Sequence, residues 1–182
     1  MDHSMSRRLI CLGCVVAVLG WSVMVRGAES LRIVPLVSAD EVVVSFELAD
    51  AYTPEIREAI SSGLRTTFTY DVELRMVGTF WVDRTVATLA VSTSDQFDNL
   101  TRRHSLLRTV DGRVAETLVT EDEALVGKWL TTFTRLPLVG TSKLDSSREY
   151  YVRIRARSRP HGDSLLGWNN AITGQSKFTF IR

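Results

Sequence analysis

Four arginines recur at every second position near the C-terminal end of the chain: Arg153, Arg155, Arg157 and Arg159. Successive side chains of a β-strand point to opposite faces of the sheet, so this spacing predicts a row of guanidinium groups on one face. Tyr151 shares that face. Guanidinium groups form forked hydrogen bonds with carboxylates and phosphates, so the row suits an acidic protein or phosphate head groups.

A second interpretation of the arginine row is structural. Opposite charges on neighbouring strands attract each other, and Asp71, Glu73 and Asp83 lie on other predicted strands. Cross-strand ion pairing is the interpretation that sheet packing favours. If a partner binds this face, the candidate contact residues are Arg153, Arg155, Arg157 and Tyr151.

One short motif is typical of enzymes that use a serine as a nucleophile. Gly162-Asp163-Ser164-Leu165 is the tetrapeptide whose serine is the nucleophile in one family of hydrolases. That chemistry requires a histidine to accept the serine proton and an acid to orient the histidine. In that family both partners follow the motif, whereas the residues after Leu165 include neither a histidine nor an acid. A polar turn is therefore the better interpretation, and a serine hydrolase is a remote alternative.

The two histidines outside the N-terminal segment, His104 and His161, have no metal-ligand partner at helical or hairpin spacing. His104 alternates with Arg103 on a predicted strand, which indicates an exposed or half-exposed structural residue. The acids at 121–123 fall in the first turn of a predicted helix, where the helix dipole favours negative charge. We predict no metal and no cofactor.

The N-terminal segment has the features of an export signal. Arg7 and Arg8 precede the apolar run from Leu9 to Val25, and small residues follow it. This pattern predicts a Sec-type signal peptide at residues 1–27. An uncleaved anchor is the alternative, because the run is at the short limit for spanning a bilayer. A lipid anchor at Cys14 is less favoured, because few apolar residues precede it.

Composition narrows the class of protein. Both cysteines, Cys11 and Cys14, lie in the predicted signal, so the mature chain would hold its fold without disulfides. Residues 28–182 are enough for one domain with a sizeable core. The whole chain has a formal net charge of +1, and this near-neutrality argues against a nucleic-acid binder.

The stretch from Leu64 to Ser92 predicts two long strands joined in a hairpin at Gly78. Alternate residues from Leu64 to Met76 are mainly apolar, and those between them are mainly polar. A period of two is typical of a strand with one buried face. The return strand, Phe80 to Ser92, is rich in β-branched and aromatic residues.

Two short helices are predicted. The first begins at Thr53-Pro54-Glu55, with an N-cap and a proline at the first helical position, and ends at Gly63. The second runs from Thr120, its predicted N-cap, to Phe133, before Pro137 and Gly140.

Turn residues separate the remaining strands. Asp111-Gly112 predicts a tight hairpin turn, residues 95–101 a polar turn and residues 160–174 a loop. Pro35 limits the first strand to an edge or a bend. The remaining predicted strands are 31–37, 42–48, 103–109, 113–119, 148–158 and 177–181.

These elements predict a mainly β (α+β) fold in a single exported domain at residues 28–182. About seven to eight strands in hairpin order, with two short helices packed on them, form an antiparallel sheet or a β-sandwich. A closed or half-closed barrel is the main alternative.

Several blocks of residues resemble a family of exported bacterial proteins, the domain of unknown function 4390. The most specific block is Thr53-Pro54-Glu55-Ile56-Arg57. Other blocks are Val44–Leu48, Phe68–Leu74, Trp81–Arg84, Leu100–Arg103 and Tyr150–Ala156. The resemblance covers most of residues 40–182 and implies a Gram-negative envelope location, and it carries over no catalytic residue.

The leading hypothesis is a non-enzymatic periplasmic domain that binds an envelope protein or an anionic envelope component through its sheet face or its arginine row. It would contact the membrane only through an uncleaved N-terminal segment, which would anchor it to the inner membrane. The alternative is a carrier that holds a lipid or another apolar ligand in a pocket of a curved sheet.

Overall fold

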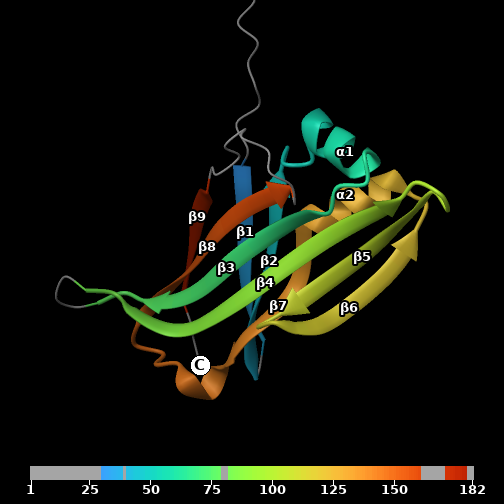
Figure 1. Cartoon of the computed structure of the whole chain (residues 1–182). Helices are drawn as coiled ribbons and strands as arrows, with labels where there is room; N and C mark the ends of the chain where they lie inside the picture. The colour runs from blue at the N-terminus through green and yellow to red at the C-terminus, as the bar shows by residue number, and fades with distance from the viewer. Residues whose placement is uncertain (1–29, 39, 79–81, 161–170, 180–182) are drawn as a thin grey trace, which may run out of the picture.

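The computed structural model describes residues 30–38, 40–78, 82–160 and 171–179. Nine strands in this part of the chain form two antiparallel sheets. The larger has six strands in the order β6-β5-β4-β3-β8-β9, and the smaller has three in the order β1-β2-β7. The small sheet lies against one face of the large one and crosses its strands at a steep angle (Figure 1). The fold is therefore a mainly β sandwich, as predicted.

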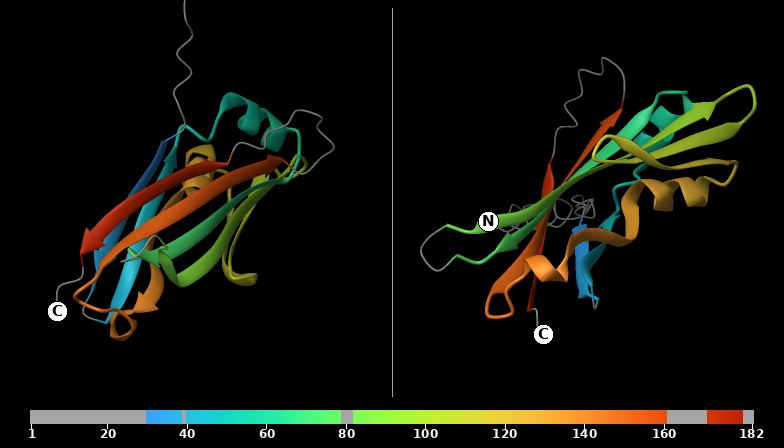
Figure 2. Two further views of the ribbon diagram at one scale, coloured as in Figure 1. Left: turned by 90° about the vertical axis from the view of Figure 1, so that its left-hand side faces the viewer. Right: turned by 90° about the horizontal axis from the view of Figure 1, so that it is seen from below.

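The large sheet is organised around the predicted hairpin. β3 (Thr66–Met76) pairs with β4 (Arg84–Asp98) on one side and with β8 (Glu149–Pro160) on the other. The buried residues of β3 alternate with half-buried polar ones, which confirms the period of two. Figure 2 shows the twist that the long strands impose on this layer. The buried apolar residues of β3 are Phe68, Tyr70, Val72 and Leu74.

The bounds of the hairpin differ from those predicted. Leu64 is exposed and precedes the strand. The predicted start of the return strand at Phe80 lies outside the described residues, and β4 continues to Asp98 through the region predicted as a turn. The turn follows at residues 99–102, so only the start of the prediction was wrong: Asp95, although acidic, continues the buried face of Val91 and Thr93.

The small sheet includes one strand that the sequence did not predict. β1 (Ser30–Val37) lies at its edge, as Pro35 indicated, and β2 (Glu41–Ala49) is central. β7 (Thr132–Gly140) occupies the region predicted as the end of a helix and a break. Because β7 is an edge strand, it tolerates Pro137, which cannot donate a ladder hydrogen bond.

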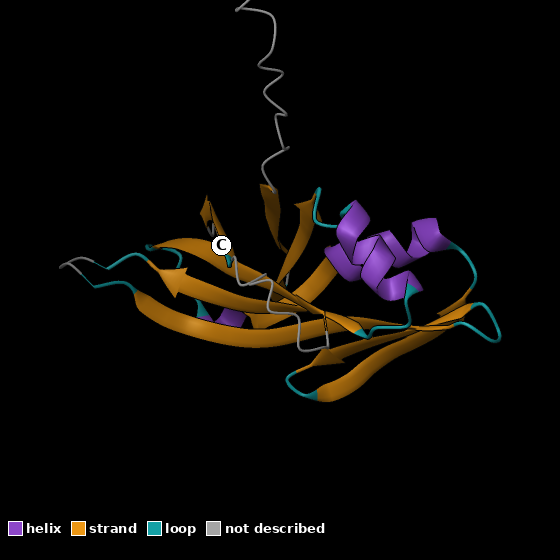
Figure 3. Ribbon diagram, turned by 45° about the horizontal axis from the view of Figure 1, so that its top comes forward, coloured by secondary structure: helices purple, strands orange, loops and turns teal. Residues whose placement is uncertain are grey.

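The two helices cover the part of the large sheet that the small sheet leaves open (Figure 3). α1 (Pro54–Ser61) is capped as predicted, because Thr53 Oγ1 accepts a hydrogen bond from the Ile56 amide. α2 (Glu123–Thr131) is capped by Asp122 instead of Thr120. Neither helix in the described part of the chain has the length and apolar character needed to cross a bilayer.

β5 (Arg103–Val110) and β6 (Arg113–Thr120) form the predicted second hairpin. Asp111 and Gly112 both have positive φ, 47° and 75°, as a tight primed turn requires. Thr120 is the last residue of β6, which explains why it does not cap α2.

β9 (Ile172–Thr179) begins earlier than predicted, and Gly174 lies within it. A Cβ at Gly174 would be 3.2 Å from side-chain atoms of Leu31 and Ile33 on β1, so the glycine permits close packing of the two sheets. β1 and β9 are not hydrogen-bonded, so the sheets remain separate and do not close into a barrel. A short 3-10 turn (Thr141–Lys143) leads from β7 towards β8.

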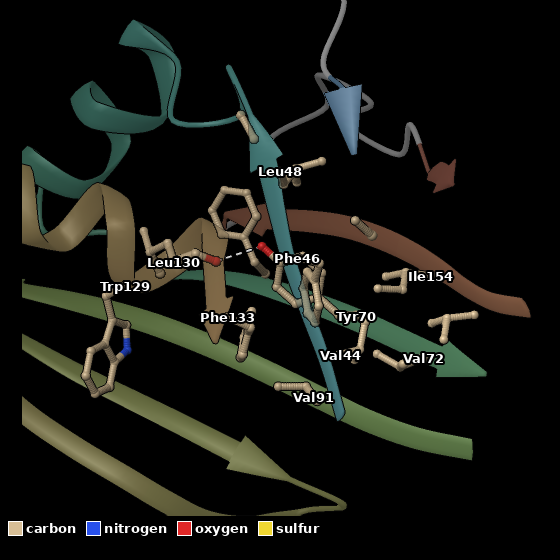
Figure 4. Close-up of a cluster of buried hydrophobic side chains, with 14 of the residues drawn as sticks. Val44, Phe46, Leu48, Tyr70, Val72, Val91, Trp129, Leu130, Phe133 and Ile154 are labelled. Atoms are coloured by element: carbon tan, nitrogen blue, oxygen red, sulfur yellow. Dashed lines mark hydrogen bonds between the residues drawn. The ribbon is translucent and has the colours of Figure 1, made fainter. Parts of the chain in front are cut away.

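The space between the layers is filled by side chains. The rings of Phe46 and Phe133 stack with centroids 4.6 Å apart, and each lies 5.1 Å from the ring of Tyr70 (Figure 4). Aromatic clusters of this kind contribute both buried area and specific ring contacts. β7, although not predicted, therefore supplies a central residue of the core.

Candidate functional site

A broad groove of about 1000 Å³ opens beside α1, between the turn joining β4 to β5 and the start of α2. Elements distant in sequence supply its walls, so only the folded chain assembles it. Its titratable lining residues include Tyr52, Arg57, Glu58, Arg102, His104 and Glu123.

A buried pair of titratable side chains holds one wall of the groove. His104 Nδ1 and Asp95 Oδ2 are 2.7 Å apart, Asp95 is fully buried and His104 is 8 % exposed. The prediction that His104 is exposed or half-exposed was wrong. Its ring points inward and lies 4.6 Å from the ring of Phe97, its partner in the β4–β5 ladder, while Arg103 points outward.

Asp95 is an unusual core residue. Burial raises the pKa of its carboxyl, and this effect outweighs the hydrogen bond from His104, which lowers it. The second carboxylate oxygen, Oδ1, is buried without a hydrogen-bond partner. A buried group of this kind costs stability. Such groups occur often at functional sites, so the pair marks the groove as a candidate site.

Tyr52 forms another wall. Burial, with smaller contributions from the negative charges of Glu123 and Asp95, raises the pKa of its hydroxyl to about 12. The phenol therefore stays protonated at neutral pH and is a hydrogen-bond donor. Its ring packs against α2 at Gly127, where an added Cβ would lie 2.9 Å from Tyr52 Cδ1.

Two cations of the groove are not neutralised by a described neighbour. The guanidinium carbon of Arg57 lies 5.9 Å from the Tyr52 ring centroid. Arg102 lies in the β4–β5 turn with a φ of 57°, a conformation that favours glycine. Neither side chain makes an ion pair with another residue in the described ranges.

The turn that carries Arg102 is held by Asp98. The Asp98 carboxylate accepts hydrogen bonds from the backbone amides of Leu100 (2.8 Å) and Thr101 (3.3 Å). These bonds favour the ionised form and lower the pKa of Asp98.

The acids of the groove differ in their pairing. Glu121 is 3.0 Å from the Arg103 guanidinium, whereas Glu58 and Glu123 have no ion pair within the described ranges. Glu123 lies in the first turn of α2, where the helix dipole stabilises its charge.

The chemistry of the pair resembles half of a catalytic triad, because a carboxylate orients a histidine. The hydrogen bond that His104 makes with a described side chain is the one to Asp95, so no hydroxyl nucleophile is engaged with it there. No group of three potential metal ligands occurs among the described residues. The arrangement can orient the ring and bind a ligand.

The structure places the predicted arginine row on the outer face of the large sheet, with two of its members ion-paired. Arg153 is 2.7 Å from Glu73, and Arg157 is 3.2 Å from Asp71. These are cross-strand contacts of the kind that the structural interpretation predicts. The side chain of Arg159 lies outside the described part of the chain.

Arg155 and Tyr151 complete the predicted set. Arg155 is exposed, makes no ion pair with a described residue, and lines a depression of about 540 Å³. Tyr151 is only 8 % exposed, and its hydroxyl donates to Asp83 at 2.6 Å. That hydrogen bond and one from the Gly78 amide lower the pKa of Asp83.

Sequence reasoning missed the groove because its residues lie in three separate segments, 52–61, 97–104 and 121–123. One signal was present for Asp95: Val91, Thr93, Asp95 and Phe97 continue the alternation of β4. The predicted signal peptide, His161 and Ser164 with its motif lie outside the described residues.

Comparison with curated proteins and with solved structures gave no significant match. A family model matches residues 27–161 and is described as "Domain of unknown function (DUF4390)". The match includes every strand except β9, both helices and all of the groove. The chain therefore belongs to the DUF4390 family.

Proposed function

We propose that this chain is an exported, non-catalytic binding domain of the bacterial cell envelope. In this proposal it contacts an acidic protein or another anionic envelope component through the outer face of the six-stranded sheet. The observation that carries the proposal is the position of Arg155, an exposed cation that has no ion pair with a described residue and lies between two arginines that are ion-paired.

The pairing pattern makes Arg155 the member of the row that can bind a partner. Glu73 and Asp71 already compensate the charges of Arg153 and Arg157. The depression next to Arg155 is also lined by Thr88 and Thr173, which offer hydroxyl groups. A forked bond from the guanidinium to a carboxylate or phosphate would combine charge with orientation.

The filled interior supports a surface partner over an apolar cargo. Phe46, Tyr70 and Phe133 are in mutual contact where the two sheets face each other. Four depressions in the described part of the chain are open and have polar residues in their walls. A lipid carrier needs an enclosed apolar pocket instead.

Export is supported by the basic and then apolar pattern of residues 1–27. Fractionation of cells that express the full chain tests this part of the proposal. Recovery from the periplasm with Ala28 as the first residue is expected. Recovery from the cytoplasm with an intact N-terminus would contradict it.

Site-specific photo-crosslinking tests the binding face. A photoreactive residue at Thr173 is expected to cross-link an envelope component in living cells, and the same residue at Val34 on the small sheet is the positional control. Adding Arg155→Ala should reduce the Thr173 product about tenfold, the typical effect of losing one charge-assisted hydrogen bond. Arg113→Ala, on exposed β6, is the matched control. Equal yields with and without Arg155→Ala would overturn the proposed face.

The non-catalytic part of the proposal has its own test. Purified chain is expected to show no esterase activity that depends on Ser164. An activity that is present in the purified chain and lost on Ser164→Ala would replace the binding proposal with the hydrolase alternative.

A further inference from the structure

The groove beside α1 presents three possible donors to one ligand, and they come from three elements. Arg57 lies on α1, Arg102 in the β4–β5 turn and His104 on β5. The two guanidinium groups are exposed and have no ion pair with a described residue. Free cations that converge on a hollow attract a negatively charged group.

The orientation of His104 determines which of its nitrogens can meet a ligand. Its Nδ1 is held by the buried carboxylate of Asp95 at 2.7 Å, and its ring lies against Phe97. The ring lines the groove, so Nε2 is the nitrogen left to bond a ligand there. A carboxylate on Nδ1 also stabilises the imidazolium that forms when an anion binds Nε2–H.

The acids of the groove select among anions. Glu58 and Glu123 lie in the same lining as Arg57 and Arg102, so the unpaired charges of the four residues sum to zero. A dianionic phosphate would face two carboxylates. A single carboxylate meets the same cations with half that repulsion, and Tyr52 offers a further neutral donor.

We propose that the groove is a second binding site, which takes a ligand ending in a single carboxylate, such as the C-terminus of a peptide, between Arg57, Arg102 and Nε2 of His104. The site is separate from the sheet face of the proposed function. The volume of about 1000 Å³ leaves room for two or three residues before the terminus.

Nuclear magnetic resonance of the full chain tests the proposal with two matched probes, N-acetyl-diglycine and its C-terminal amide. The acid is expected to shift the ring resonances of His104 at millimolar concentration. The amide, which lacks the charge, is expected to leave them in place. Inorganic phosphate is expected to bind more weakly than the acid.

Three arginine variants complete the test. Arg57→Ala and Arg102→Ala should each weaken binding of the acid about tenfold, whereas Arg155→Ala, on the outer sheet face, should not change it. The proposal is overturned if the amide shifts the ring resonances of His104 as much as the acid does, or if phosphate binds more tightly than the acid. It is also overturned if Arg57→Ala and Arg102→Ala bind the acid as tightly as the unmodified chain does. Because Arg155→Ala affects only the sheet face, failure of this site and failure of the proposed function give different results.

Discussion

The hydroxyl of Tyr70, on β3, donates a 2.7 Å hydrogen bond to the backbone carbonyl of Leu130, near the C-terminal end of α2. Thr93, on β4, donates to the same carbonyl at 3.0 Å. The last carbonyls of a helix have no partner within the helix, so here the sheet supplies their donors. These bonds fix α2 on the sheet and thereby fix the wall of the groove that α2 provides.

Tyr70→Phe is expected to lower the free energy of unfolding by about 1–2 kcal/mol, because it removes one buried hydrogen bond and retains the ring. Burial also raises the pKa of Tyr70, so its hydroxyl remains a donor at any physiological pH. Urea unfolding measures the change. Because Thr93 shares the acceptor, Tyr70→Phe combined with Thr93→Val should lose more than the sum of the two single changes. If the losses in the two single variants simply add up in the double variant, the two hydroxyl groups are not coupled through the Leu130 carbonyl.

Arg108 is the second link between the sheet and α2. Its guanidinium carbon lies 4.4 Å from the Trp129 ring centroid and 4.5 Å from that of Phe133. The same group donates to the carbonyl of Trp129 and to Glu116. A flat, forked cation can make all of these contacts at once, and an ammonium group cannot.

Arg108→Lys is therefore expected to lower the free energy of unfolding by about 2–3 kcal/mol although the charge is retained. Arg103→Lys is the matched control, because Arg103 forms a largely exposed pair with Glu121 and should change stability by less than about 0.5 kcal/mol. Thermal and urea unfolding of both variants decide the question. Equal losses of stability in the two variants would contradict the view that Arg108 stabilises the fold through its contacts with the rings of Trp129 and Phe133.

The parts of the fold that the sequence predicts well are those determined by local pattern. Phe68, Tyr70, Val72 and Leu74 alternate with polar residues, and this alternation placed β3 and its buried face correctly. The cap at Thr53 and the turn at Asp111-Gly112 rest on side-chain and backbone geometry within a few residues. Such features need no knowledge of distant segments.

The parts that the sequence did not predict depend on contacts between distant segments. β7 is a strand because it pairs with β2, and Phe133 belongs to that strand instead of the helix. Gly174 resembles a loop residue until Leu31 and Ile33 are packed against it. The groove was missed for the same reason, since the local pattern predicts a turn at Asp95 and an exposed or half-exposed His104, whereas both are buried.

Gly127 shows how the groove constrains α2. Glycine within a helix is about 1 kcal/mol less favourable than alanine, so propensity alone predicts that Gly127→Ala stabilises the chain. The added Cβ would lie 2.9 Å from Tyr52 Cδ1, so the ring would have to move. We expect a net loss of about 1 kcal/mol in the free energy of unfolding. Lys128→Ala, one residue away and exposed, is the control. A gain of stability for Gly127→Ala would show that Tyr52 moves at little cost.

Asp95 makes the pH dependence of stability unusual. Burial raises the pKa of its carboxyl in the folded chain above the ordinary value of 3.8. The folded chain then binds this proton more tightly than the unfolded chain does. The contribution of Asp95 is therefore fully favourable below the ordinary pKa, and it is lost as the pH rises through the raised value. Above the raised pKa, the ionised and buried carboxylate lowers the free energy of unfolding.

Asp95→Asn is accordingly expected to be at least as stable as the unmodified chain at neutral pH, because the amide oxygen still accepts the hydrogen bond from His104 and carries no buried charge. Its stability relative to the unmodified chain should decrease as the pH is lowered through the raised pKa of Asp95 towards the ordinary value, and stay constant below that value. Asp98→Asn should show the opposite trend, since the pKa of Asp98 is lowered and its charge stabilises the folded turn above that pKa. Urea unfolding at a series of pH values measures both. If Asp95→Asn is instead less stable at neutral pH and the difference disappears in acid, the charge of Asp95 supports the fold, and its burial is no longer a reason to assign the groove a function.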